Sequence, residues 1–126
     1  MNSEKQPYRI LLADDHMMFR QGVKRIIEET PDLSVIGEVS DGLELLKTLN
    51  SLTADLVILD ISMPSLRGIE ATHEIKNSNP SVKVLILTMH KDKEHLLHAI
   101  SAGAEGYLLK EDADTELFSA IEKIRQ

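Results

Sequence analysis

The amino-acid sequence predicts an α/β domain with a doubly wound, five-stranded parallel sheet and five helices. Five short apolar runs alternate along the chain with five segments whose apolar residues recur at helical spacing. The runs are almost continuously apolar, which is typical of strands that are buried on both faces of a parallel sheet. A length of 126 residues fits one such domain, and the core is large enough to need no disulfide bonds in a chain without cysteine.

The five strands are predicted in chain order from these runs. Residues 10–13, 56–59, 84–87 and 107–109 are continuous apolar runs and predict strands buried on both faces. Residues 33–39 form a more mixed run, which predicts a strand at the edge of the sheet. Because parallel strands need crossover connections, each predicted helix is expected to link one strand to the next.

The five helices are predicted from apolar stripes with a spacing of three or four residues. The stripes are Phe19, Val23, Ile26 and Ile27; Leu45, Leu46, Leu49 and Leu52; Ile69, Thr72 and Ile75; Leu96, Leu97 and Ile100; and Leu117, Phe118, Ile121 and Ile124. Asp41 with Glu44 forms an acidic variant of the capping box, which predicts the start of the second helix. Pro80 predicts the end of the third helix, and Gly103 predicts a left-handed cap after the fourth.

The charge balance and hydropathy of the chain restrict its partners. The 21 acidic and 14 basic residues give a formal net charge of −7, so the domain itself is not expected to bind the phosphate backbone of a nucleic acid. No apolar run approaches the roughly 20 residues that a membrane span needs. Residues 1–7 lack the apolar core of a signal peptide. We therefore expect a cytoplasmic domain without a membrane partner.

Polar residues follow four of the five predicted strands. Asp14 and Asp15 follow the first strand, Asp60 the third, Thr88 the fourth and Lys110 the fifth. Ligands of open α/β sheets bind outside the carboxyl ends of the strands, so these side chains are expected to converge on one edge of the sheet.

A cluster of three carboxylates needs a compensating cation, because like charges disfavour each other's ionised forms. Carboxylate oxygens suit Mg²⁺, and Lys110 adds a further positive charge at the same edge. Such a site is suited to phosphoryl transfer, in which a carboxylate can be the covalent acceptor. Asp60 is the predicted nucleophile, and Asp14 and Asp15 are predicted to hold the metal.

These motifs resemble those of a response-regulator receiver domain. The resemblance is carried by residues 12–16 (LADDH), by residues 60–64 (DISMP) with Gly68, by Thr88, and by residues 107–110 (YLLK). It covers about residues 9–124. Within this family, residues 13–16 (ADDH) and 103–110 (GAEGYLLK) are similar to the NarL/FixJ, or LuxR-type, subfamily. The resemblance implies a single receiver domain over residues 1–126 with the flavodoxin-like strand order 2-1-3-4-5.

The resemblance also implies roles for the acidic residues. Asp60 matches the aspartate that accepts phosphate from the phosphohistidine of a sensor histidine kinase. Asp15 matches a direct Mg²⁺ ligand, and Asp14 matches its neighbour, which often acts through water. Ser62 matches the position whose backbone carbonyl completes the metal shell.

Three further positions match residues that act on the phosphoryl group or respond to it. Lys110 matches the lysine that pairs with a phosphoryl oxygen, Thr88 the switch hydroxyl, and Tyr107 the aromatic residue whose rotamer follows that hydroxyl. Ser62 and His90 occupy variable positions that influence phosphate lifetime in relatives.

The expected function is that of a phosphoryl-accepting signalling domain rather than a conventional enzyme. Phosphorylation is expected to switch partner binding or homodimer formation, and the aspartyl phosphate can be lost by self-dephosphorylation. NarL/FixJ-type relatives continue into a helix-turn-helix domain that binds DNA, and this chain contains none. We expect the N-terminal part of a longer transcription regulator, although a stand-alone receiver has the same features. The alternative is a phosphate-independent pseudo-receiver that acts as a protein-interaction module.

Histidines near the predicted fourth helix offer another interpretation. His95 and His98 are three residues apart and His90 is close in sequence, which is compatible with a zinc site. No cysteine completes such a site, and both helical histidines lie between apolar members of the stripe. A solvated helix face is therefore the preferred interpretation of these residues.

Overall fold

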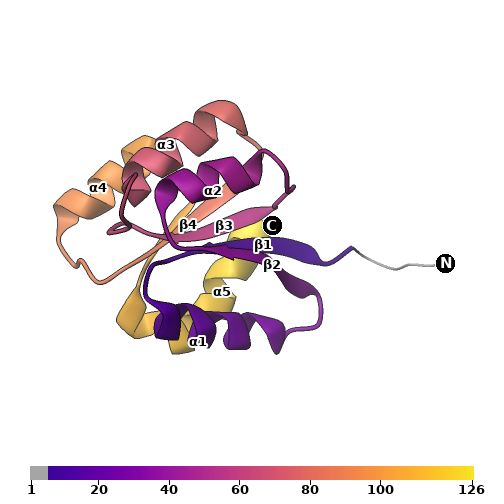
Figure 1. The fold of residues 1–126 in the computed structure, drawn as a ribbon. Helices are drawn as coiled ribbons and strands as arrows, with labels where there is room; N and C mark the ends of the chain where they lie inside the picture. The colour runs from indigo at the N-terminus through magenta and orange to yellow at the C-terminus, as the bar shows by residue number, and fades with distance from the viewer. Residues whose placement is uncertain (1–5) are drawn as a thin grey trace.

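The computed structural model describes residues 6–126, which fold into a five-stranded parallel sheet covered by helices on both faces (Figure 1). The strand order is β2-β1-β3-β4-β5, which confirms the predicted fold class and topology. The first five residues of the predicted domain and of its polar N-terminal segment lie outside the described residues. Among residues 6–126, no helix combines the length and the apolar character needed to cross a bilayer.

The strands agree with the predicted runs to within two residues at each end. They are β1 (Tyr8–Ala13), β2 (Leu33–Val39), β3 (Leu56–Asp60), β4 (Lys83–Thr88) and β5 (Gly106–Leu109). The edge position of β2 is confirmed. The prediction that the fifth strand is buried on both faces is wrong, because β5 lies at the opposite edge and all four of its residues are only half-buried.

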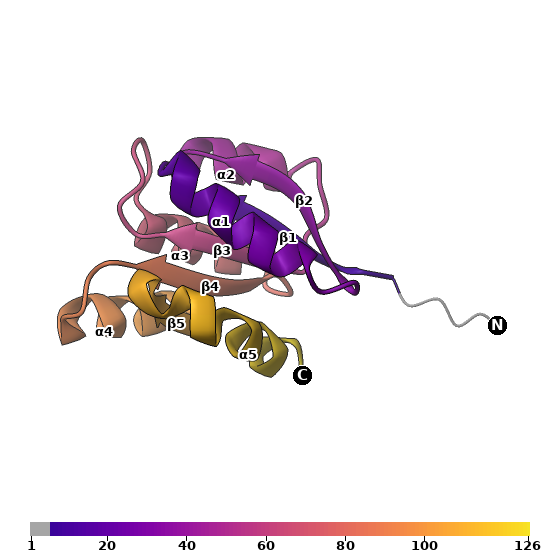
Figure 2. The same cartoon turned by 90° about the horizontal axis from the view of Figure 1, so that it is seen from below.

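The helices form two layers on opposite faces of the sheet (Figures 1 and 2). They are α1 (Met17–Glu28), α2 (Gly42–Leu49), α3 (Gly68–Ser78), α4 (Lys93–Ala102) and α5 (Ala113–Arg125), with a short 3₁₀ turn, η1 (Lys110–Asp112), before α5. One layer holds α2, α3 and α4, and the other holds α1 and α5. Alternate residues of each central strand therefore face two separate apolar cores.

The helix boundaries follow the predicted signals. Asp41 is the N-cap of α2, and its carboxylate accepts a hydrogen bond of 2.7 Å from the Glu44 N–H, while the Glu44 side chain accepts one from Ser40. The third helix ends at Ser78, two residues before Pro80. Gly103 caps α4 at φ 101°, a left-handed conformation that favours glycine.

Parts of three predicted apolar stripes are wrong. Leu52 lies beyond the end of α2 and is exposed, because that helix stops at Leu49. Leu97 and Ile100 on α4 are both 59% exposed, and Phe118 on α5 is half exposed. The fourth helix instead buries its small residues Ala99 and Ala102, which allow it to pack closely.

The register of the strands places their carboxyl ends side by side. Ala13 pairs with Leu59, so the next residues along the two strands, Asp14 and Asp60, lie beside each other. Thr88, the last residue of β4, pairs with the last residue of β5, which brings Lys110 to the same edge. The four polar segments predicted to converge therefore do so.

Candidate functional site

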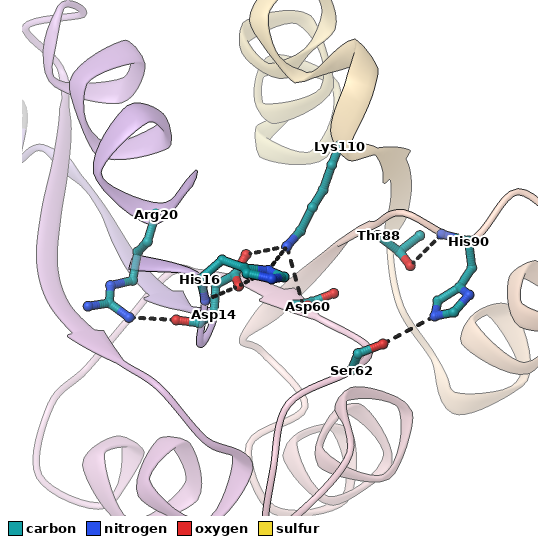
Figure 3. Close-up of polar contacts among 8 residues, drawn as sticks. All are labelled: Asp14, His16, Arg20, Asp60, Ser62, Thr88, His90 and Lys110. Carbon is teal, nitrogen blue, oxygen red and sulfur yellow. Dashed lines mark hydrogen bonds and ion pairs between the residues drawn. The ribbon is translucent and has the colours of Figure 1, made fainter. Parts of the chain in front are cut away.

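An acidic pocket, formed by the carboxylates of Asp14, Asp15 and Asp60 and closed by Lys110, lies at this edge. Figure 3 shows Asp14, Asp60 and Lys110. Asp14 and Asp60 are buried, with only 6% and 3% of their surface exposed. The Lys110 ammonium lies between them, 2.9 Å from Asp14 Oδ2 and 3.4 Å from Asp60 Oδ2. Residues separated by as many as 96 positions thus form one compact charged group.

The donor set of this pocket fits a hard divalent cation. Four potential ligand atoms lie within 4.8 Å of one another: one carboxylate oxygen each from Asp14, Asp15 and Asp60, and one ring nitrogen of His16. Asp15 belongs to this group although it is exposed. Oxygen ligands from a few carboxylates, completed by water, suit Mg²⁺. Two of these carboxylates are shielded from solvent, so their mutual repulsion gives a binding cation a favourable electrostatic environment.

Burial raises the pKa of Asp60 above its ordinary value. The positive charge of Lys110 opposes this shift, the negative charge of Asp14 adds to it, and a hydrogen bond from the Ser62 N–H opposes it again. Desolvation therefore disfavours the ionised form of Asp60, and the charge of Lys110 compensates only part of this cost.

Two residues of α1 that sequence reasoning did not assign to the site support it. The Lys110 ammonium lies 4.5 Å from the centre of the Phe19 ring, a cation–π contact that fixes the direction of the lysine. The Arg20 guanidinium donates to the Asp14 carbonyl (Figure 3). It also forms an ion pair of 2.9 Å with Glu38. Phe19 was predicted only as a member of the core stripe, and nothing in the sequence distinguishes Arg20 from a surface cation.

His16 approaches the pocket although it is exposed. It is the N-cap residue of α1, and its backbone N–H donates to Asp14 Oδ1 at 2.9 Å. Its Nδ1 atom lies 3.2 Å from Lys110 Nζ. The ring therefore forms part of the rim of the acidic pocket (Figure 3).

Gly68 allows the backbone to pass close to Asp60. A Cβ atom at this position would lie 2.3 Å from the carbonyl oxygen of Asp60, a contact that no side chain could make without moving the backbone. The Gly68 N–H donates to the Ile61 carbonyl at 2.9 Å, which closes the loop between β3 and α3. This close approach explains why a glycine stands at this place in the motif.

The other predicted site residues form a second group beside the pocket. Thr88 is fully buried, and its Oγ1 accepts a hydrogen bond of 3.1 Å from the His90 N–H. The Tyr107 hydroxyl donates to the His90 carbonyl at 3.0 Å. Ser62 Oγ lies 3.1 Å from His90 Nε2, which joins the loops after β3 and β4 (Figure 3).

The seven predicted site residues thus divide into two sets. Asp14, Asp15, Asp60 and Lys110 form the acidic pocket itself. The others, Thr88, Tyr107 and Ser62, each form a hydrogen bond with His90, and the Ser62 N–H also donates to Asp60. His90 is the residue that connects the set.

A doubly wound sheet that presents a buried aspartate, two further carboxylates and a lysine at its carboxyl edge defines the receiver class of signalling domains. The family model for the response regulator receiver domain matches residues 10–122, and the chain belongs to this family. Receiver domains generally bind Mg²⁺ in their acidic pocket, and phosphorylation by a kinase is the general mechanism of the family.

Individual relatives agree with this assignment. The transcriptional regulatory protein DegU of Brevibacillus brevis is 40% identical over 119 residues, which cover 94% of this chain and 50% of DegU. A LuxR-family two-component response regulator from Aurantimonas sp. SI85-9A1 superposes with a TM-score of 0.89 at 39% identity, covering 94% of this chain and 85% of that one. The receiver domain of the putative response regulator NarL from Mycobacterium tuberculosis gives 0.89 at 28% identity, covering 94% and 96%.

These relatives confirm the resemblance to the NarL/FixJ, LuxR-type subfamily and to its role in transcription regulation. The chain spans about half the length of the curated relatives it matches.

Proposed function

We propose that this chain accepts a phosphoryl group on the Asp60 carboxylate from the phosphohistidine of a sensor histidine kinase. The observation that carries the proposal is the position of the Lys110 ammonium, 2.9 Å from Asp14 and 3.4 Å from Asp60. A phosphoryl group can enter this acidic pocket only if positive charge neutralises its anionic oxygens, and Lys110 supplies such a charge. Membership of the receiver family supports the same reaction.

The chemistry is a transfer between two nucleophiles. An oxygen of the Asp60 carboxylate attacks phosphorus, the P–N bond of the donor breaks, and the departing imidazole nitrogen takes up a proton. Lys110 turns from the carboxylates to a phosphoryl oxygen and neutralises part of its charge. Since the chain accepts the group and releases it to water, we propose a signalling domain rather than a conventional enzyme.

A Mg²⁺ cofactor is part of the proposal. Asp15 and Asp60 would bind it directly, Asp14 through water, and Ser62 through its backbone carbonyl. When bound, Mg²⁺ supplies positive charge to the phosphoryl oxygens and the attacking carboxylate. Without the ion, the Lys110 ammonium offsets part of the negative charge of Asp14 and Asp60.

Thr88 and Tyr107 are proposed to transmit the change. A Thr88 hydroxyl that turns toward the phosphoryl group loses its hydrogen bond with the His90 N–H. Tyr107 holds the carbonyl of the same residue, so it is released or redirected together with the loop. The phosphoryl group thereby shifts a two-state equilibrium of the loop after β4.

The output is proposed to be a change in self-association or in the contacts of an attached effector domain. The name of the relative DegU describes a transcriptional regulatory protein, and this chain spans half of it. We propose a cytoplasmic regulator whose receiver occupies residues 1–126, with an ordered core over about residues 9–124. DNA would be bound by a helix-turn-helix domain beyond this chain rather than by the acidic receiver.

Intact-mass measurement after incubation with acetyl phosphate tests the proposal. The wild-type chain is expected to gain one phosphoryl group in the presence of Mg²⁺ and none after chelation. Asp60→Asn is expected to gain none, whereas Asp114→Asn, which changes an exposed carboxylate on α5, behaves as wild type.

A gain that persists in Asp60→Asn would overturn the assignment of the acceptor. No gain in any variant would favour the alternative of a phosphate-independent pseudo-receiver. Size-exclusion chromatography with light scattering on the phosphorylated and unphosphorylated chain then tests the proposed change in self-association.

A further inference from the structure

A second group of potential metal ligands lies outside the acidic pocket. His90 follows β4 by two residues, Asp92 is the N-cap of α4, and His95 lies in the first turn of that helix. Each offers one nitrogen or oxygen atom, and these three atoms lie within 4.8 Å of one another. The preferred sequence interpretation, a solvated helix face, does not account for this convergence.

The three side chains already lie in contact with one another. His95 Nδ1 lies 2.7 and 2.8 Å from the two Asp92 carboxylate oxygens. The rings of His90 and His95 are stacked, with centroids 4.2 Å apart and planes 6° from parallel. The hydrogen bond with His95 lowers the pKa of Asp92, so this carboxylate is ionised at neutral pH.

The backbone that carries His90 is also fixed. Its N–H donates to Thr88 Oγ1 at 3.1 Å and its carbonyl accepts the Tyr107 hydroxyl at 3.0 Å. A ligand that binds this side chain therefore meets a positioned loop, and the cost of ordering the chain has already been met by folding.

We propose that His90, Asp92 and His95 bind a divalent transition-metal ion of the Zn²⁺ class. Two imidazoles and one carboxylate, with water in the remaining position, are a donor set that suits Zn²⁺ and does not suit Mg²⁺. The positive end of the α4 dipole disfavours a cation at this place, and the charge of Asp92 at the N-cap offsets it. The acidic pocket would then bind Mg²⁺, and this second site would bind Zn²⁺.

Binding requires one defined movement. Stacked imidazoles direct their nitrogen lone pairs in parallel, whereas ligands of one ion must point to one centre. The His90 ring therefore turns away from its stacked position, and its Nε2 leaves Ser62 Oγ, now 3.1 Å away (Figure 3). Occupancy of the second site thus breaks the hydrogen bond between the loop after β4 and the loop that follows Asp60 at the end of β3.

The remaining histidines supply internal controls. His98 is one helical turn beyond His95 and is exposed, and it is not a member of the group. His73 Nε2 instead contacts Asn77 on α3 at 3.3 Å. His16 belongs to the acidic pocket, so its response distinguishes Zn²⁺ in that pocket from Zn²⁺ in the second site.

The test is a Zn²⁺ titration of the chain without a polyhistidine tag, in excess Mg²⁺, followed by NMR signals of the histidine rings. We expect His90 and His95 to shift together and to saturate at one equivalent, while His73 and His98 do not respond. In isothermal titration calorimetry, His90→Asn and His95→Asn are each expected to weaken Zn²⁺ binding by about tenfold or more, and His98→Asn is expected to match wild type.

Saturable binding that first shifts His16 would place Zn²⁺ in the acidic pocket and overturn the proposal. Equal shifts of His98 and His95, or an affinity unaffected by His90→Asn and His95→Asn, would do the same. The circular dichroism spectrum of each variant checks that it is folded. Because the titration uses no phosphoryl donor, its outcome is independent of whether Asp60 accepts phosphate.

Discussion

At the scale of single residues, the acidic pocket is held in place at a cost. Asp60 is almost completely buried, and burial raises its pKa despite the neighbouring Lys110. Asp14 keeps the shorter contact with that lysine, 2.9 Å against 3.4 Å for Asp60. Asp60 is therefore the less compensated of the two buried carboxylates, which suits a group that is to receive a phosphoryl group and a metal ion.

Asp60→Asn is expected to raise the melting temperature of the metal-free chain at neutral pH. A carboxyl whose pKa is raised on folding destabilises the folded state when ionised, and this cost is fully present above the folded pKa. The cost disappears as the pH falls below the unfolded value of about 3.9. The difference between Asp60→Asn and wild type should therefore shrink between about pH 7 and about pH 4.

Thermal melts in a chelating buffer check this expectation, and Asp114→Asn is the matched control on an exposed carboxylate. Lys110 keeps its partner Asp14 in the Asp60 variant, so no unpaired lysine complicates the comparison. A lower melting temperature for Asp60→Asn at neutral pH would mean that attraction to Lys110 outweighs desolvation.

At the scale of secondary-structure elements, α4 differs most from its predicted form. Its larger apolar residues, Leu97 and Ile100, face outward, and it packs through Ala99 and Ala102. Both sets recur every three residues, so periodicity alone does not distinguish the buried set from the exposed one. Close approach to the sheet and to α3 favours the small residues.

Two substitutions on α4 should therefore change stability in the opposite way to that expected from the predicted stripe, in which Ile100 is buried. Ile100→Gln is expected to change the free energy of unfolding by less than about 0.5 kcal/mol, because the side chain is exposed. Ala99→Leu is expected to cost about 1–3 kcal/mol, because the site is fully buried and already filled. Urea denaturation of both variants measures these values. A large cost for Ile100→Gln that depends on protein concentration would show that a second copy covers this face.

At the scale of the whole molecule, the sheet determines the site. The carboxyl ends of β1, β3, β4 and β5 meet at one edge, so residues from three of these segments form the acidic pocket and Thr88, at the end of β4, lies beside it. The two helix layers cover the two faces of the sheet and bury the strands between them (Figure 2). A cation bound in the acidic pocket would connect the end of β3 to the loop after β1, and it would therefore stabilise the fold as a whole.

Mg²⁺ is expected to stabilise the chain against unfolding by mass action. At a concentration one hundred times the dissociation constant, the gain is about 2.7 kcal/mol if the ion binds only the folded state. Asp15→Asn should lose most of this gain at the same Mg²⁺ concentration, since it removes a proposed direct ligand. Urea denaturation with and without Mg²⁺ measures the gain, and an equal gain in Asp15→Asn would exclude that residue as a ligand.

The sequence by itself determined the order of the elements, because each strand and helix has its own local signal. The Asp41 carboxylate starts a helix by accepting a hydrogen bond from the N–H of Glu44. Gly103 ends another helix in a left-handed conformation that few other residues adopt. The candidate site was predictable for a related reason. Asp60 ends a strand, Asp14 and Lys110 directly follow one, and parallel strands end at a common edge.

Only the tertiary structure decided which of these side chains pair and which surfaces are covered. Lys110 lies closer to Asp14 than to Asp60, and His90 stacks on His95, because the register of strands and the position of α4 set distances between side chains that no sequence spacing encodes. The outward face of Ile100 has the same origin. Local periodicity specifies that a helix has an apolar side, whereas contact with the neighbouring layer selects the side that is buried.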